Sequence, residues 1–146
     1  MRYFFLSFLG MWLMAFDFAP PPVQPAKQAV GPRTGGGVAP RIHFEKNSFE
    51  IPESEKNILA QNIDWLSENR GAVFILEGHC DEWGLDNYNL ELGDERAREV
   101  KAYLIEKGVD PERIIMVVSY GASRPLDARS TMEGWAANRR VEFVLR

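Results

Sequence analysis

An aspartate, an asparagine and an arginine lie within one short stretch of this sequence, residues 78–98, between an expected strand and an expected helix. Asp81 stands near the start of the stretch and Arg96 near its end. A carboxylate accepts charge-assisted hydrogen bonds from an ammonium group, and the planar guanidinium fork binds a carboxylate through two N–H groups. These residue types therefore predict a pocket for a zwitterion.

The elements that must position these side chains follow from the apolar pattern. Residues 72–76 are an unbroken apolar run rich in β-branched and aromatic residues, which predicts a strand that ends close to Asp81. A helix is expected from Asp86 or Asn87 to about Lys107, because Gly108 favours a helix end. Its apolar stripe is formed by Ala97, Val100 and Leu104.

Arg96 lies on the inward side of that expected helix. It precedes Val100 by four residues and Tyr103 by seven, whereas Arg98 and Lys101 fall on the opposite, solvated side. An inward arginine needs a partner. Asp81 in a structural ion pair and the carboxylate of a bound ligand are the two interpretations that the sequence leaves open.

The rest of the chain predicts three more strands and two more helices. Strands are expected over residues 42–45, 114–118 and 141–145, and helices over residues 54–68 and 131–137. The alternating order predicts an α/β fold of the α+β sandwich type. We expect a four-stranded mixed sheet with its helices mainly on one face, and parallel crossovers between the early strands.

The first forty residues differ from the rest. Residues 4–18 are almost wholly apolar and follow Arg2, so residues 1–19 are interpreted as a signal-like or anchor segment whose cleavage is unresolved. Residues 20–40, rich in Pro and Gly, are expected to be a linker. The folded domain is then expected over residues 41–146.

Charge and cysteine content exclude some functions. Only four charged side chains precede residue 41, which leaves 14 basic and 20 acidic ones in the domain and argues against nucleic acid as a partner. Cys80 is the only cysteine, so no intrachain disulfide is possible and no thiol lies near the N-terminus to carry a lipid anchor. Membrane association through the N-terminal segment is therefore left open.

Two chemical alternatives centre on Cys80. A thiol hydrolase would use it as nucleophile, but the adjacent His79 points to the other side of an extended segment, which leaves only the distant His43 as a base. A metal site formed by residues 79–82 is disfavoured because contiguous ligands on an extended chain diverge. We therefore expect no enzyme activity, no metal and no cofactor.

Several ordered motifs give the domain a resemblance to a known family. They are Glu77-Gly-His-Cys-Asp-Glu-Trp-Gly84, Tyr88-Asn-Leu90, Gly93-Asp-Glu-Arg-Ala97, Val117-Val-Ser-Tyr-Gly121, Arg124-Pro125 and Trp135-Ala-Ala-Asn-Arg-Arg-Val-Glu-Phe143. Over residues 41–146 the chain resembles OmpA-like peptidoglycan-binding domains, and among them the peptidoglycan-associated lipoproteins (Pal). It departs from the Pal pattern in having no N-terminal lipidated cysteine and in carrying Trp83.

The resemblance implies non-covalent binding of peptidoglycan through the diaminopimelate residue of its stem peptide. The family's aspartate and arginine correspond by motif to Asp81 and Arg96, which would take the ammonium and the carboxylate of diaminopimelate. Asn89 is expected to add neutral hydrogen bonds, and Arg139 either flanks the same pocket or, with Asn138, ties the last strand to the loop after Tyr120.

The resemblance also implies a place and a second kind of partner. It implies the periplasmic side of a Gram-negative envelope, in association with the outer membrane. Proteins of the Tol system are the alternative partners, because Pal-like domains also meet them.

Overall fold

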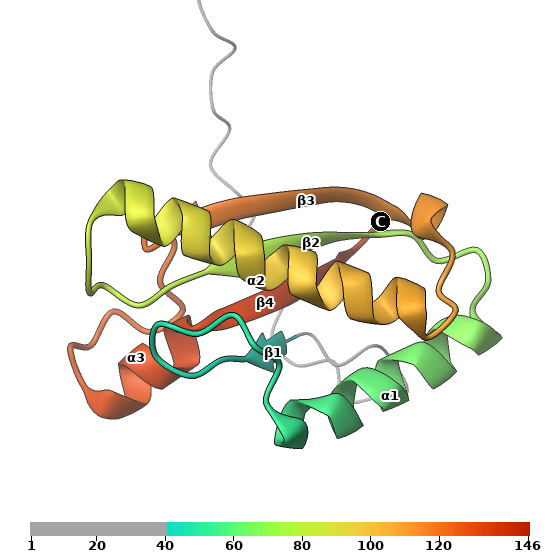
Figure 1. Ribbon diagram of the computed structural model, residues 1–146, viewed down its shortest axis with the longest axis horizontal. Helices are drawn as coiled ribbons and strands as arrows, with labels where there is room; N and C mark the ends of the chain where they lie inside the picture. Colours follow the sequence, from blue (N-terminus) through green and yellow to red (C-terminus); the bar gives the residue numbers. More distant parts are fainter. Residues whose placement is uncertain (1–40) are drawn as a thin grey trace, which may run out of the picture. The chain divides into compact units, whose positions relative to one another are not determined.

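The computed structural model describes residues 41–146, in which four strands and three α-helices alternate (Figure 1). In chain order the elements are β1 (Arg41–His43), α1 (Glu53–Glu68), β2 (Phe74–His79), α2 (Asp86–Glu106), the 3-10 helix η1 (Pro111–Arg113), β3 (Ile114–Gly121), α3 (Met132–Asn138) and β4 (Arg140–Leu145). This order confirms the expected fold class. The expected signal-like segment (1–19) and linker (20–40) lie outside the described residues.

The sheet is mixed, in the order β1-β4-β2-β3. Strands β2 and β3 are parallel neighbours joined by the α2 crossover, whereas β4 runs antiparallel to β1 and to β2. As expected, β1 and β2 run in the same direction, and so do β2 and β3. However, β1 and β2 are not neighbours, because β4 lies between them. The last strand can take this inner place because Val141 and Phe143 supply the apolar face that an inner strand needs.

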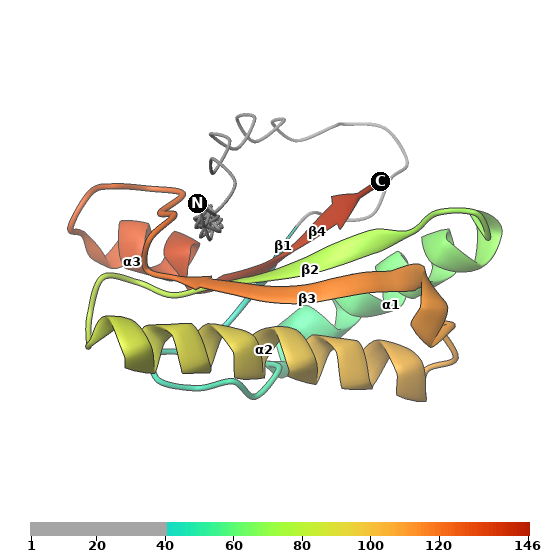
Figure 2. The ribbon, with the colours of Figure 1, turned by 90° about the horizontal axis from the view of Figure 1, so that it is seen from above.

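The core lies between one face of the sheet and the two long helices. Figure 2 shows α1 and α2 on the same side of the sheet. Alternate residues of the strands point to that side and are buried with the helix stripe: Phe74, Leu76, Val141 and Phe143 from the sheet, and Ala97, Val100 and Leu104 from α2. The predicted stripe of α2 is thus confirmed. The third helix lies at the end of the sheet where β2 ends and β4 begins (Figure 1).

Local signals explain where the helices start and stop. The Thr131 side chain caps α3 by accepting a hydrogen bond from the Gly134 N–H at 3.2 Å. Gly108, at φ +94°, takes the left-handed conformation that follows α2. Within residues 41–146 no helix has both the length and the apolar character needed to cross a membrane.

Helix α2 packs unusually close to the sheet through two glycines. A Cβ atom built on Gly78 of β2 would lie 1.9 Å from the carbonyl oxygen of Gly93 in α2. A Cβ atom on Gly93 would in turn lie 2.3 Å from the hydroxyl oxygen of Ser119 in β3. Only glycine permits this approach, and the approach sets how the start of α2 sits over the ends of β2 and β3.

Gly78→Ala should therefore push α2 away from the sheet and lower the free energy of unfolding by roughly 3 kcal/mol, as overpacking of a dense core does. Urea denaturation followed by circular dichroism measures this. Gly71→Ala is the matched control, because a Cβ atom there meets nothing within 4 Å. Equal stability of the two variants would contradict the close approach.

Candidate functional site

Asp81 lies two residues beyond the end of β2, where the sheet opens into loops. The Cys80 N–H still donates to the carbonyl oxygen of Gly121 at 2.9 Å, so Asp81 begins on a fixed backbone. Its side chain is buried, and each carboxylate oxygen accepts one hydrogen bond: from Arg139 Nη1 at 3.1 Å and from the Trp83 N–H at 3.3 Å. A buried carboxylate with a cationic partner is thus held at the sheet end.

Arg96 is fully buried on the inner side of α2, as the sequence predicted. Its guanidinium donates three strong hydrogen bonds to carbonyl oxygens: Nε to Ser48 at 2.8 Å, Nη2 to Glu45 at 2.9 Å and Nη1 to His79 at 3.0 Å. Nη1 also meets the Cys80 sulfur at 3.4 Å. The β1–α1 loop and the end of β2 are therefore joined through one side chain.

The side chain paired with Asp81 is therefore Arg139 and not Arg96. Asp81 contributes to the electrostatic environment of Arg96 without forming its ion pair. Burial lowers the pKa of Arg96 from its ordinary value, and the guanidinium still stays charged at neutral pH. The structural ion pair that the sequence left open is thus found with a different arginine.

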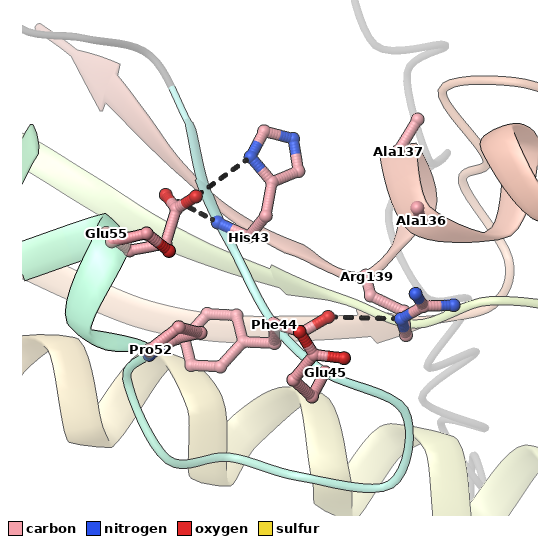
Figure 3. Close-up of a pocket in the computed structure, with 9 residues that line it drawn as sticks. His43, Phe44, Glu45, Pro52, Glu55, Ala136, Ala137 and Arg139 are labelled. Carbon is pink, nitrogen blue, oxygen red and sulfur yellow. Dashed lines mark hydrogen bonds and ion pairs between the residues drawn. The ribbon is translucent and has the colours of Figure 1, made fainter.

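Arg139 occupies the junction between α3 and β4. Its Nε donates to the Phe44 carbonyl oxygen at 3.0 Å (Figure 3). Its Nη1 donates to Asp81. With 15% of its side chain exposed, Arg139 is the more accessible of the two site arginines. Arg139 lies beside Asp81, and its part in a ligand pocket stays a prediction. Asn138 ties down the loop after Tyr120, since its Oδ1 accepts from the Leu126 and Asp127 N–H groups.

Asn89 is buried in the first turns of α2 and supports the loop that follows Asp81. Its side-chain Nδ2 donates to the backbone carbonyl oxygen of Trp83 at 3.1 Å, and its backbone carbonyl oxygen accepts from the Cys80 thiol at 3.2 Å. The structure thus brings Asp81, Asn89, Arg96 and Arg139 to one end of the sheet. Their direct contact with a ligand stays a prediction.

Two grooves lie at this end of the domain. A groove of about 340 Å³ lies between the β1–α1 segment and α3, with Arg139 on its wall (Figure 3). A smaller one of about 190 Å³ is lined by residues that flank the pair in sequence, namely Cys80, Glu82 and Asn138, and by Trp135. A ligand lying in the larger groove would therefore contact Arg139.

Trp83 stands beside this end of the domain with half of its surface exposed. Its ring packs edge-on against Trp135 at 5.4 Å between centroids, and the Lys46 ammonium lies 5.5 Å from the ring centroid. Trp135 is fixed in turn, since its Nε1 donates to Glu82 at 2.8 Å. The two tryptophans form a partly exposed aromatic rim next to Asp81.

The geometry gives no support to Cys80 as a nucleophile. Burial raises the pKa of its thiol, which therefore stays protonated and donates to a carbonyl oxygen. The neighbouring His79 instead stacks on Tyr120, with 5.6 Å between ring centroids. Both observations agree with the expectation of a non-catalytic site.

Sequence reasoning missed the carbonyl oxygens that hold the arginines. Phe44, Glu45 and Ser48 act through their backbone, so their side-chain types carry no signal. An inward arginine on an apolar stripe was the one available hint that backbone acceptors lie nearby.

Comparison with known proteins places this geometry in a family. The OmpA family profile matches residues 43–139, which include all four site residues. The chain belongs to the OmpA family. That membership agrees with the expectation that the domain is not an enzyme.

The chain is similar to several proteins named peptidoglycan-associated lipoprotein. It is 35% identical over 108 residues to the one from Mesorhizobium japonicum, covering 74% of this chain and 64% of the relative. It is 39% identical over 102 residues to that from Pseudomonas aeruginosa, covering 70% and 60%. The chain thus spans somewhat less than two thirds of the length of these relatives.

Solved structures show the same fold. The peptidoglycan-associated lipoprotein from Burkholderia pseudomallei matches with a TM-score of 0.68 and 29% identity, covering 73% of this chain and 90% of that one. The C-terminal domain of MotB from Helicobacter pylori matches with a TM-score of 0.67 at 24% identity, covering 73% and 83%, and supports the fold alone.

Arg96→Lys keeps the charge but cannot reach three carbonyl oxygens at once, so buried acceptors lose their donors. We expect the free energy of unfolding to fall by about 3 kcal/mol, measured by urea denaturation. Arg98→Lys, on the solvated side of the same helix, is the control and should leave stability unchanged. A mild effect at both positions would contradict the role given to Arg96.

Proposed function

We propose that residues 41–146 bind peptidoglycan without catalysis, by holding the diaminopimelate residue of its stem peptide. Membership of the OmpA family and similarity to proteins named peptidoglycan-associated lipoprotein support the polymer as ligand. The observation that carries the finer proposal is the Asp81–Arg139 pair, because it sets two opposite charges 3.1 Å apart, and Arg139 also lines the larger groove.

The free end of diaminopimelate is a zwitterion and can replace both members of that pair. Its ammonium would donate to Asp81, and its carboxylate would accept from the Nη groups of Arg139. Because the two protein charges already neutralise each other, a zwitterion enters without leaving an unpaired charge. A ligand with a single charge would leave either the carboxylate or the guanidinium without a partner.

Arg96 has a more limited part in this proposal. Four of its N–H groups donate to the β1–α1 loop and to the end of β2, which leaves one N–H on Nη2 without a hydrogen-bond partner within residues 41–146. That N–H can add a single hydrogen bond to the ligand carboxylate. Asn89 acts indirectly, because its side chain holds the loop between Asp81 and α2 in place.

A domain with this binding role belongs on the periplasmic side of a Gram-negative envelope, where it would link the envelope to the wall. We propose this location, with outer-membrane association. Residues 1–19 as signal-like or anchor segment and residues 20–40 as linker stay predictions.

A protein partner is the second candidate, and a Tol-system protein fits the family resemblance. The observation in its favour is a run of exposed large apolar side chains beside Asp81: Trp83, Leu85, Tyr88 and Leu90. Trp83→Ala and Leu85→Ser should then weaken a complex with such a protein while sacculus binding persists.

Asp81→Asn and Arg139→Gln should each weaken binding to diaminopimelate-containing sacculi by about tenfold or more, since each removes a charge-assisted hydrogen bond. Co-sedimentation with purified sacculi measures the change, and thermal unfolding verifies that each variant folds. Asp94→Asn and Arg98→Gln are matched controls, because these two residues form an ion pair on the solvated side of α2 and are not part of the proposed pocket. Undiminished binding by the two site variants would refute the proposed pocket.

A soluble diaminopimelate-type stem peptide should compete with sacculi, and a lysine-type stem peptide should compete at least about tenfold less well. Lysine keeps the ammonium but lacks the second carboxylate, so the contact with the site arginines is lost. Competition co-sedimentation over a peptide concentration series measures the ratio. Equal competition by both peptides would show that the site arginines do not bind the second carboxylate of the ligand.

A further inference from the structure

The sheet face turned away from α1 and α2 carries an imidazole and two carboxylates on neighbouring strands. Glu77 and His79 are two residues apart on β2, so their side chains leave the same face. Glu142 of β4 lies directly opposite Glu77 in the strand register. One potential ligand atom from each of the three side chains lies within 4.8 Å of the other two.

The buried ring of His79 is an independent observation that points to a bound ligand at this cluster. Its side chain is 3% exposed, and within the described residues neither Nδ1 nor Nε2 has a hydrogen-bond partner. The nearest carboxylate oxygen, Glu77 Oε2, is 3.9 Å from Nε2, which is too far for a direct hydrogen bond. A buried polar ring without a partner costs free energy, and a bound ion at the carboxylates would remove that cost.

The donor set selects a class of metal. One imidazole nitrogen and two carboxylate oxygens suit zinc and similar divalent transition metals, whereas calcium and magnesium prefer oxygen ligands alone. Neither ring nitrogen of His79 has a hydrogen-bond partner within residues 41–146, so a nitrogen lone pair of the neutral ring can serve as a ligand. The carboxylates are each 16% exposed, which lets solvent supply a further ligand.

Neighbouring arginines orient one carboxylate and also limit the affinity. Glu142 Oε1 accepts from Arg140 Nε at 2.7 Å and from Arg41 Nε at 3.2 Å, which fixes the orientation of this carboxylate. Hydrogen bonds of this kind to a ligating carboxylate are usual around metal sites. Arg124, stacked on Tyr120 at 3.6 Å, adds a third positive charge, whose repulsion should weaken the binding of a cation.

We propose that Glu77, His79 and Glu142 form a binding site for a divalent transition-metal ion of the zinc class. The site shares no residue with the Asp81–Arg139 pair. The two are connected through the backbone, since the His79 carbonyl accepts from Arg96. A bound ion would therefore stiffen the end of β2 that precedes Asp81.

The test uses the full chain, free of affinity tags and stripped of metal with a chelator. Zinc titration by calorimetry and cobalt titration by visible absorption should both show one saturable site. His79→Ala should abolish it, and Glu77→Gln should weaken it by about tenfold or more. Glu77→Gln keeps the size of the side chain, so it serves if His79→Ala does not fold.

His43→Ala is the matched control, because the sequence has only two histidines and His43 also lies near a carboxylate, with Nδ1 3.9 Å from Glu55. Binding should be unchanged in this variant. The proposal is overturned if the wild-type chain binds neither metal, or if binding is lost in His43→Ala and retained in Glu77→Gln. In the first outcome, water would be the partner of His79.

Discussion

The end of the sheet depends on the buried guanidinium of Arg96. A charged group without exposure is tolerated only when its donors are satisfied, because the desolvation cost is several kcal/mol per ion. Here carbonyl oxygens of Glu45, Ser48 and His79 satisfy it. Two of the three belong to the β1–α1 loop, which has no regular secondary structure. One helix residue thus gives a loop the fixed position that its own sequence does not encode.

The Asp81–Arg139 pair follows from that arrangement. Once the loop is fixed, the Phe44 carbonyl oxygen is in place to orient Arg139, whose Nη1 then donates to Asp81. The two arginines therefore have different parts. Arg96 holds the backbone of the site, and Arg139, which is less buried, supplies the charge that a ligand can reach. In this account the loss of either arginine impairs binding, but only the loss of Arg96 also costs much stability.

The local pattern of apolar residues was sufficient to predict the helices and strands, and to predict that Arg96 points inward. The stripe of Ala97, Val100 and Leu104 defined the buried side of α2, and the apolar run before Asp81 placed that residue near a strand end. The partner of Asp81 was out of reach, since Arg139 lies 58 positions further along the chain. Their meeting depends on β4 entering the sheet between β1 and β2, which no local pattern reveals.

The same limit applies to the cluster on the opposite face. The sequence drew attention to His79 among its contiguous neighbours, whose side chains diverge. Its companions in space are Glu77, two residues earlier, and Glu142, which the strand register brings alongside. Period-two spacing alone would have paired His79 with Glu77, but the third member needs the pairing of β2 with β4.

The most direct measurement is a crystal structure of the domain with a diaminopimelate-type stem peptide. The account predicts the free ammonium at about 3 Å from the Asp81 carboxylate and the adjoining carboxylate at about the same distance from Arg139. A peptide bound elsewhere, with the Asp81–Arg139 pair intact and untouched, would contradict it.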